Sequence, residues 1–171
     1  MQSHVSTRRG VADVLFDAFY SGAIGGSIVA LFFLFVDLVR AEPLFTPSLM
    51  GSVLFGGVDA AQVRGVDLGM VALYSIVHFA SFGVLGTLVA LAVHEVELHS
   101  KHPAVVLGVL FLIFEGAFGL AAALVMPGAI TQIGAVHVAI ANLLAAAGMG
   151  LFFMTSHQPA VWRRIRGSVR I

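Results

Sequence analysis

The stretch LGMVALYSIVHFASFGVLGTLVALAV, residues 68–93, contains no acidic or basic side chain except one histidine. A helix needs roughly 20 apolar residues to cross the hydrocarbon core of a bilayer. The stretch exceeds that length, so it predicts a membrane-spanning helix. The histidine is His78, close to the middle, and an imidazole at that depth needs a packing or functional reason.

Three further apolar runs have the same character, at about residues 16–40, 104–126 and 130–155. Residues typical of helix ends support these limits, since Asp67 precedes the second run, Pro103 opens the third and Pro127 follows it. Four such runs predict a single membrane domain over residues 1–171. The expected fold is all-α, a polytopic integral membrane protein with an up-down bundle of four transmembrane helices.

The composition fits a chain embedded in lipid. Hydrophobic residues make up 59% of the 171 residues and charged residues only 11%, whereas soluble domains carry roughly 25% charged residues. The chain has no cysteine, which excludes disulfides, thiol catalysis, iron–sulfur clusters and c-type haem attachment on this chain. No basic patch with interleaved aromatic residues precedes the C-terminal tail, so nucleic-acid binding is not expected.

Arginines at the two ends predict the orientation in the membrane. Arg8 and Arg9 precede the first span, and four more arginines follow the last span: Arg163, Arg164, Arg166 and Arg170. Basic residues favour the cytoplasmic side, so both termini of this four-span chain are expected in the cytoplasm, at a cytoplasmic (inner) membrane. A cleaved signal peptide is the weaker interpretation of the first span, because its apolar run exceeds the roughly 7–15 residues of such a hydrophobic region.

The C-terminal tail, residues 158–171, combines a tryptophan with basic residues. Trp162 stands beside arginines of the tail: Arg163, Arg164 and Arg166. Tryptophan prefers the headgroup region of a bilayer, and juxtamembrane arginines are attracted to anionic lipids. We therefore expect the tail to contact lipid headgroups or a partner subunit.

The first outer loop contains a short helical pattern, FTPSLMGSVLFGG, at residues 45–57. Thr46 is predicted as the N-cap of a helix, with Pro47 at its first position. One face of residues 46–56 is apolar and another carries serines. The pattern predicts an interfacial helix lying at the outer membrane surface.

Glycine and alanine recur at helical spacing within three of the spans. The sets are Gly22, Gly26 and Ala30 in the first span, Gly108, Gly119 and Ala122 in the third, and Ala141, Ala145 and Gly148 in the fourth. Helices in lipid associate mainly through close packing, which small residues permit. These sets therefore predict helix contacts, and space for a flat cofactor is the alternative.

Four ionisable residues lie inside the spans or near their outer ends: Asp37, His78, Glu115 and His137. Such groups usually face the bundle interior, because their burial in hydrocarbon is costly. The helical rise puts His78 and Glu115 roughly 16 Å from the outer end, and His137 roughly 9 Å from it. We therefore expect the two histidines and Glu115 to converge. Asn142 lies about 140° around its helix from His137, so its expected role is a hydrogen bond to another helix.

Four interpretations of this cluster remain open. His78 and His137 suit the two axial ligands of a haem b placed between diagonal helices. The same histidines with Glu115 and Asp37 suit a transition-metal ion, because zinc, copper and iron accept imidazole and carboxylate ligands. Carboxylate–histidine chains also act as proton relays in membranes. Finally, Glu115 and His78 can pair simply to lock the register of two helices.

The expected function is that of a small subunit or accessory of a membrane redox assembly, with His78, His137 and Glu115 holding haem or a metal ion. The alternative is a transporter-like or purely structural bundle whose buried Glu and His residues relay protons or lock helix packing. No independent catalytic activity is expected, since the sequence has no serine, cysteine or phosphate-binding constellation. The expected partners are the lipid bilayer and other membrane subunits or a second copy of the chain.

Overall fold

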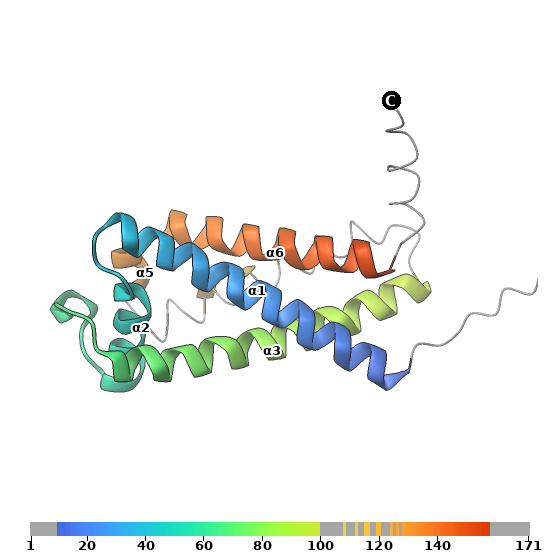
Figure 1. Cartoon of the computed structure of the whole chain (residues 1–171), viewed down its shortest axis with the longest axis horizontal. Helices are drawn as coiled ribbons and strands as arrows, with labels where there is room; N and C mark the ends of the chain where they lie inside the picture. Colours follow the sequence, from blue (N-terminus) through green and yellow to red (C-terminus); the bar gives the residue numbers. More distant parts are fainter. Residues whose placement is uncertain are drawn as a thin grey trace, which may run out of the picture.

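The computed structural model describes residues 10–99 and 128–157, together with residues 108, 112, 115, 116, 119, 120, 124 and 126. The helices within this part, shown in Figure 1, are α1 (Val11–Val39), α2 (Phe45–Gly56), the short 3-10 helix η1 (Ala60–Gln62), α3 (Leu68–His99), α5 (Ala129–Ile133) and α6 (Ala135–His157). These residues contain no strand. The all-α prediction is therefore confirmed for the part of the chain that is described.

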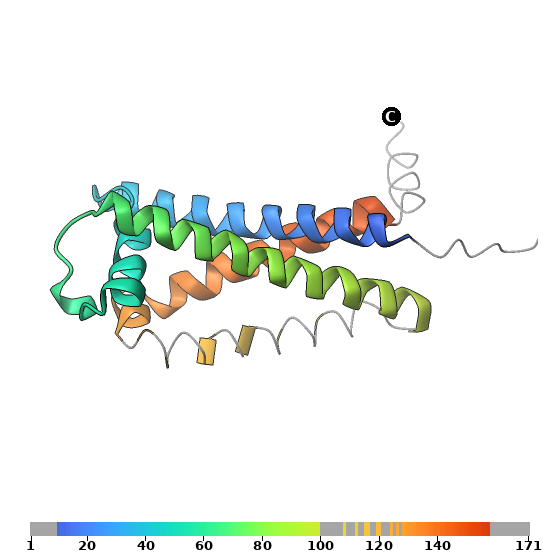
Figure 2. The same cartoon turned by 90° about the horizontal axis from the view of Figure 1, so that it is seen from below.

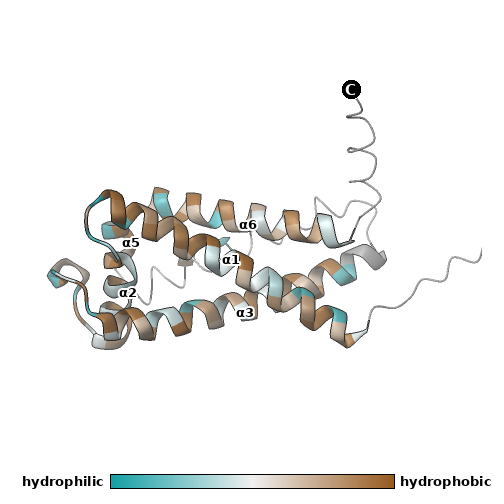
Figure 3. Ribbon diagram, in the orientation of Figure 1, coloured by the Kyte–Doolittle hydropathy of each residue, from teal (hydrophilic) through white to brown (hydrophobic). Residues whose placement is uncertain are grey.

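Three of the helices are long and apolar enough to cross a membrane. They are α1, residues Leu68–Glu95 of α3 and residues Ala135–Ser156 of α6, and hydrophobic residues line most of their length in Figure 3. Each overlaps a predicted span, although α3 continues past the predicted end at Val93. Helices of this length and composition indicate a membrane protein.

The third predicted span, residues 104–126, lies largely outside the described residues. Those described from Gly108 to Leu124 are helical, and Leu112 and Leu120 among them are well exposed. The basic tail also lies outside the described residues. The residues predicted there to contact lipid or a partner are Trp162, Arg163, Arg164 and Arg166.

Helix α1 is the centre of the described bundle. It packs against both α3 and α6, and residues of all three helices form one buried cluster: Ala18, Ala90, Val93 and Phe153. Figures 1 and 2 show α1 crossing α3 at an angle, with α6 running beside both helices. The packing of the long helices therefore depends on two different faces of α1.

Glycines allow α1 and α3 to approach until their backbones are in contact. A Cβ atom built on Gly22 would lie 2.5 Å from the carbonyl oxygen of Phe82. One built on Gly86 would collide with the Ala18 carbonyl oxygen and lie 2.6 Å from the amide nitrogen of Gly22. Ser21 is fully buried at this crossing and donates from Oγ to the Gly86 carbonyl oxygen at 3.4 Å. The predicted helix contact at Gly22 is therefore confirmed, as close packing in lipid requires.

Helices α1 and α6 meet through side chains as well as small residues. Ala141 and Ala145 of α6 are buried in one cluster with Val29 of α1. A Cβ atom built on Gly148 would meet isoleucine side chains of α1 and no backbone atom. The contact predicted for the fourth span is thus confirmed, but it is less tight than the contact between α1 and α3.

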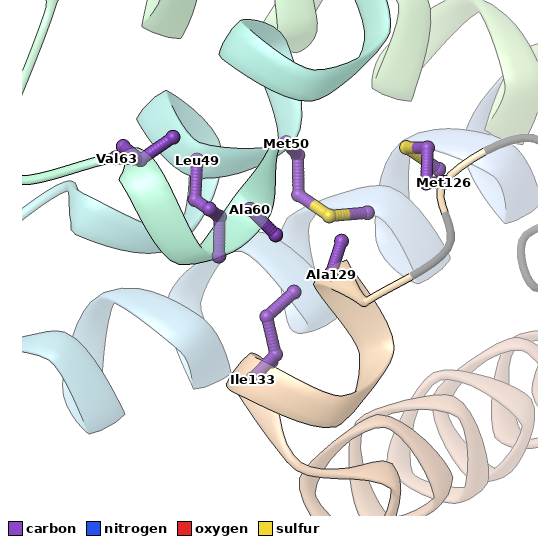
Figure 4. Packing of buried hydrophobic residues seen from close by; sticks show 7 residues of the cluster. All are labelled: Leu49, Met50, Ala60, Val63, Met126, Ala129 and Ile133. Carbon is purple, nitrogen blue, oxygen red and sulfur yellow. The ribbon is translucent and has the colours of Figure 1, made fainter. Parts of the chain in front are cut away.

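Helices α2, η1 and α5 enclose a small core at the end of the bundle where α1 ends and α3 begins (Figure 4). Its buried members are Leu49, Met50, Ala60, Val63, Met126, Ala129 and Ile133. Gly51 of α2 lies so close to α3 that a Cβ atom there would collide with the Met70 carbonyl oxygen. The apolar face of α2 is therefore packed against protein, and its position at a membrane surface stays a prediction.

The two helix starts predicted from capping residues have different outcomes. Asp67 caps α3 as predicted, because its Oδ1 accepts from the amide nitrogens of Gly69 at 2.8 Å and Met70 at 3.2 Å. The prediction for Thr46 is wrong, because α2 already begins at the residue before it. Leu44 occupies the N-cap position with φ 67° and offers no side-chain hydrogen bond. The acceptor for the N–H groups in the first turn of α2 therefore comes from another part of the chain.

The predicted fourth span is interrupted near its start. Helix α5 ends at Ile133, Gly134 has φ 96° and ψ 114°, and α6 begins at Ala135. Glycine adopts such a conformation readily, whereas residues with a side chain do not. Gly128 has φ 86° just before α5, next to Pro127, where the sequence predicts the end of the third span. The segment over residues 130–155 is therefore a short helix followed by a long one.

Candidate functional site

The four ionisable residues predicted in or near the spans lie on separate parts of the chain. Asp37 is near the end of α1, and His78 is within α3. Glu115 belongs to the third predicted span, and His137 is the third residue of α6. Asp37 is fully buried, whereas the other three are partly buried. Their hydrogen-bond partners decide what each of them can do.

His78 binds the backbone of α1. Its Nε2 lies 3.0 Å from the carbonyl oxygen of Gly26, and a carbonyl oxygen only accepts, so Nε2 carries the proton and donates. The rings of three neighbours on α3 lie with their centroids 5.9, 5.2 and 4.9 Å from the imidazole: Tyr74, Phe79 and Phe82. His78 thus joins α3 to α1 through one hydrogen bond amid aromatic contacts.

Glu115 pairs with Asn142 of α6. Asn142 Nδ2 donates to Glu115 Oε1 at 2.8 Å, so the predicted hydrogen bond between helices is confirmed for Asn142. The pair of Glu115 with His78, one of the four interpretations, is not found among the described residues, where His78 donates to Gly26. The angle of about 140° between Asn142 and His137 predicted a hydrogen bond from Asn142 to another helix, but it did not identify Glu115 as the partner.

His137 lies beside the break between α5 and α6. Its Nδ1 is buried and has no hydrogen-bond partner in the described part of the chain. A Cβ atom built on Gly134 would lie 2.7 Å from this nitrogen. Glycine at position 134 therefore provides both the backbone conformation and the space that the imidazole occupies.

Asp37 caps α2 from a different helix. Its Oδ2 accepts from the backbone nitrogen of Thr46 at 2.8 Å, and its Oδ1 accepts from the Thr46 hydroxyl at 2.6 Å. The N–H groups in the first turn of a helix have no acceptor within that helix, and Leu44 provides none. A carboxylate here also opposes the positive end of the helix dipole. Asp37 therefore fixes the corner of the fold at which α1 ends and α2 begins.

Ser48 makes a second polar connection within the same corner. Its Oγ accepts from the Asp67 amide at 2.8 Å and donates to the Gly65 carbonyl oxygen at 3.4 Å. Thr46 and Ser48 are both buried. Sequence reasoning missed these two roles, because a serine or threonine near an aspartate does not reveal which groups meet after folding.

The ionisable residues do not form one site. Among residues 10–99, 128–157 and the described positions between them, no three His, Asp or Glu side chains lie close enough to hold a metal ion. His78 of α3 donates to the backbone of α1, whereas His137 lies at the start of α6. The sequence predicted a shared metal or haem site from His78, His137, Glu115 and Asp37. The described part of the structure does not support that site for either group.

No protein-family model matches the chain, and comparisons with curated proteins and with solved structures find no match either. The site is therefore defined by its geometry alone. That geometry is a set of hydrogen bonds that connect separate helices of an apolar bundle. The described part of the chain is a helical bundle with polar links between its helices, three of which are long and apolar enough to cross a membrane.

Proposed function

We propose that the protein is a four-span integral membrane protein that serves as a structural membrane subunit, in which intramembrane polar residues lock helix packing. The observation that supports this most is that two polar side chains within the apolar helices form hydrogen bonds to other helices. His78 binds the Gly26 carbonyl of α1, and Glu115 accepts from Asn142 of α6. Both bonds join different helices, and hydrogen bonds of this kind help to hold helices together in lipid.

A fourth span at residues 104–126 is part of this proposal. The run is apolar along its whole length apart from Glu115, and it is long enough to cross the hydrocarbon core. Leu112, Leu120 and Leu124 are each more than 60% exposed, at 68, 64 and 73%. Leucines that no protein covers are suited to contact with lipid, which supports a position within the bilayer.

The proposed orientation has both termini in the cytoplasm. The start of α1 and the end of α6 lie at the same end of the bundle in Figures 1 and 2. Arg8 and Arg9 precede the first helix, and the arginines of residues 163–170 follow the last. Basic residues at this end therefore favour the cytoplasmic side of an inner membrane.

Helix α2 is proposed to face the outer membrane surface. It lies at the end of the bundle opposite to the start of α1 and the end of α6 (Figure 1). Leu49 and Met50 are buried against protein, whereas Phe55 and Val58 remain exposed at 45 and 37%. Exposed apolar residues beside a helix end are typical of contact with the interfacial region.

Binding of haem or a metal ion in a redox assembly is the second candidate function. One observation favours it, the buried Nδ1 of His137 that has no partner among the described residues, because imidazole nitrogen is a common ligand. Purified protein in detergent would then show a Soret band, or a bound metal by elemental analysis. A colourless, metal-free and folded preparation would remove this candidate.

Cysteine labelling tests the proposed topology, because the chain has no cysteine of its own. Ala61→Cys lies in the first outer loop and Gly10→Cys before α1, and both positions are exposed. We expect a membrane-impermeant maleimide to label the first only from the outside and the second only from the cytoplasmic side. Ile76→Cys, on an exposed lipid-facing position of α3, should stay unlabelled from both sides. Labelling of positions 10 and 61 from the same side would contradict the topology.

A further inference from the structure

We propose that the protein forms a parallel dimer through one face of α1, in which Ser27 of one copy is hydrogen-bonded to Ser27 of the other. The inference rests on the proposed function and deepens it, because it names a second copy of the chain as the partner of the structural subunit. The residues of this face follow one another at helical spacing. They are called the Ser27 face and are Phe16, Tyr20, Ala23, Ser27, Leu31 and Leu38.

The Ser27 face points away from the helices that α1 contacts. Its large side chains are exposed at 56, 43, 63 and 57%: Phe16, Tyr20, Leu31 and Leu38. Ser27 is exposed and Ala23 is partly exposed. The opposite side of α1, which includes Gly22 and Gly25, is buried against α3 and α6. The Ser27 face is therefore available for contact with a molecule outside the chain.

The hydroxyl of Ser27 has no hydrogen-bond partner among the described residues. Ser27 is residue 17 of the 29 in α1, so it lies roughly 3 Å from the centre of the helix along its axis. Ser75 and Thr87 of α3 instead donate to carbonyl oxygens four residues earlier, at 2.7 and 2.9 Å. The hydrocarbon core offers no acceptor or donor of its own. A partner for Ser27 at this depth therefore has to come from another protein segment.

A second copy supplies that partner at the correct depth. A hydroxyl both donates and accepts, so one serine is a complete match for another. Two copies that cross the membrane in the same direction can be related by a twofold axis along the membrane normal, and identical residues near this axis then meet. A different subunit would need its own polar residue at the depth of Ser27. The self-complementary hydroxyl therefore favours a second copy.

Small residues beside Ser27 allow the two copies of α1 to approach. Ala23 lies four residues before it and Ala30 three residues after it, so all three lie near one side of the helix. Both alanines are partly exposed. Close approach of helices in lipid depends on such small residues. The two Ser27 hydroxyls can therefore come within hydrogen-bond distance of each other.

Ser81 of α3 provides a matched control within the same chain. It is also exposed and has no hydrogen-bond partner in the described part of the chain. The residues at the same two spacings are valines, however: Val77 and Val84, exposed at 37 and 63%. Their branched side chains keep a neighbouring helix away from the Ser81 hydroxyl. Ser81 is therefore expected to have no part in the dimer.

The first test is a disulfide cross-link, because the chain has no cysteine of its own. Ser27→Cys and Ser81→Cys are each placed in phosphatidylcholine vesicles and treated with iodine. Iodine takes two electrons from two thiols and becomes iodide, while the thiols release two protons and form the disulfide. We expect Ser27→Cys to give a covalent dimer in SDS electrophoresis that a reductant removes, because its two Cα atoms meet at the axis. Ser81→Cys should stay monomeric.

The second test measures the dimer without a covalent bond. Copies labelled with donor and acceptor dyes at Gly10→Cys should show energy transfer that falls as lipid dilutes the protein. Ser27→Ala should raise the dissociation constant about threefold through loss of the hydrogen bond. Ala23→Leu should raise it on the order of tenfold through its bulk. Ser81→Ala should leave it unchanged, and circular dichroism checks that each variant remains folded.

Three results would overturn the proposal: no energy transfer at any ratio of protein to lipid, equal cross-linking of the two cysteine variants, or no effect of Ser27→Ala. Maleimide labelling at positions 10 and 61 separates this failure from failure of the proposed topology. Labelling as expected together with a monomeric protein would contradict the dimer alone. The Ser27 face would then be assigned to lipid or to a different subunit.

Discussion

The two faces of α1 pack in different ways. Towards α3, backbone meets backbone: a Cβ atom on Gly86 would collide with the Ala18 carbonyl oxygen, and His78 donates to the Gly26 carbonyl oxygen. Towards α6, side chains fill the contact, and a Cβ atom on Gly148 would meet the end of the Ile28 side chain. The α1–α3 contact can accept an extra methyl group only if the helices move apart, whereas the α1–α6 contact can accept one through a change of side-chain rotamer.

This difference shows how one helix can anchor a bundle in lipid. Water does not drive apolar helices together there, so close packing and hydrogen bonds between helices carry the association. The α1–α3 contact uses both, through its glycines and through Ser21 and His78. The α1–α6 contact relies on packing of small and branched residues. We therefore expect substitutions to be far more damaging on the α3 side.

The largest effect is expected for Gly86→Ala. The new methyl group would overlap backbone atoms of Ala18 and Gly22, so α1 and α3 would have to move apart, at a cost of about 3 kcal/mol in the free energy of unfolding. Gly83→Ala is the matched control on the same helix, because a Cβ atom there has nothing within 4 Å in the described residues. Unfolding in mixed micelles with increasing SDS, followed by circular dichroism, measures both. Equal losses for the two variants would contradict the backbone contact.

The next effect concerns the end of α1. Asp37→Ala removes both acceptors of the buried Thr46 and leaves its N–H and hydroxyl without partners, which should lower the free energy of unfolding by about 2 kcal/mol. Asp59→Ala is the control, because Asp59 accepts from the Ala61 amide at an exposed site. The same SDS titration compares them. A loss for Asp59→Ala as large as that for Asp37→Ala would show that burial of the cap is unimportant.

A smaller effect is expected for Gly148→Ala on the α6 side. Only side-chain atoms of Ile24 and Ile28 oppose the new methyl group, and a rotamer change can relieve the overlap at a cost of about 1 kcal/mol. The double variant Gly148→Ala with Ile28→Val should recover part of this loss in the same titration. If Gly148→Ala is as damaging as Gly86→Ala, the two faces of α1 do not differ as described.

The smallest effect is expected for the pair of Glu115 with Asn142. Asn142→Leu removes the donor to Glu115 and should lower the free energy of unfolding by about 0.6 kcal/mol, as is usual for hydrogen bonds between membrane helices. Leu143→Ala tests the adjacent lipid-facing position, since Leu143 is 63% exposed. Melting of both variants in detergent, followed by circular dichroism, gives the comparison. An unchanged melting temperature for Asn142→Leu would mean that the bond does not stabilise the bundle.

Local sequence signals predicted helix starts well only where the cap is local. Asp67 caps α3 through amides two and three residues further on, so neighbouring residues contain the whole interaction. The cap of α2 comes instead from Asp37, nine residues before Thr46 and on another helix. Thr46 has the right chemistry for an N-cap, and tertiary contacts gave it a different role.

The expected cluster of ionisable residues shows a similar limit. Depth along each helix was predictable from the rise per residue, and it put His78 and Glu115 at the same level. Residues at one level meet only if both helices also turn the right faces to each other. His78 is hydrogen-bonded to Gly26 and Glu115 to Asn142, so these two side chains lie at one level without bonding to each other.

The residues alone were enough to predict a helical chain that is apolar enough for a membrane, because the length of an apolar run does not depend on neighbouring helices. They were also enough to predict the start of α3 at Asp67, since that cap is local. The partners of Asp37, His78 and Glu115 became known from the folded arrangement of the helices. The reason is that such partners depend on how far each helix is rotated about its axis and where it crosses the next, and glycine contacts such as that of Gly22 with Gly86 set both.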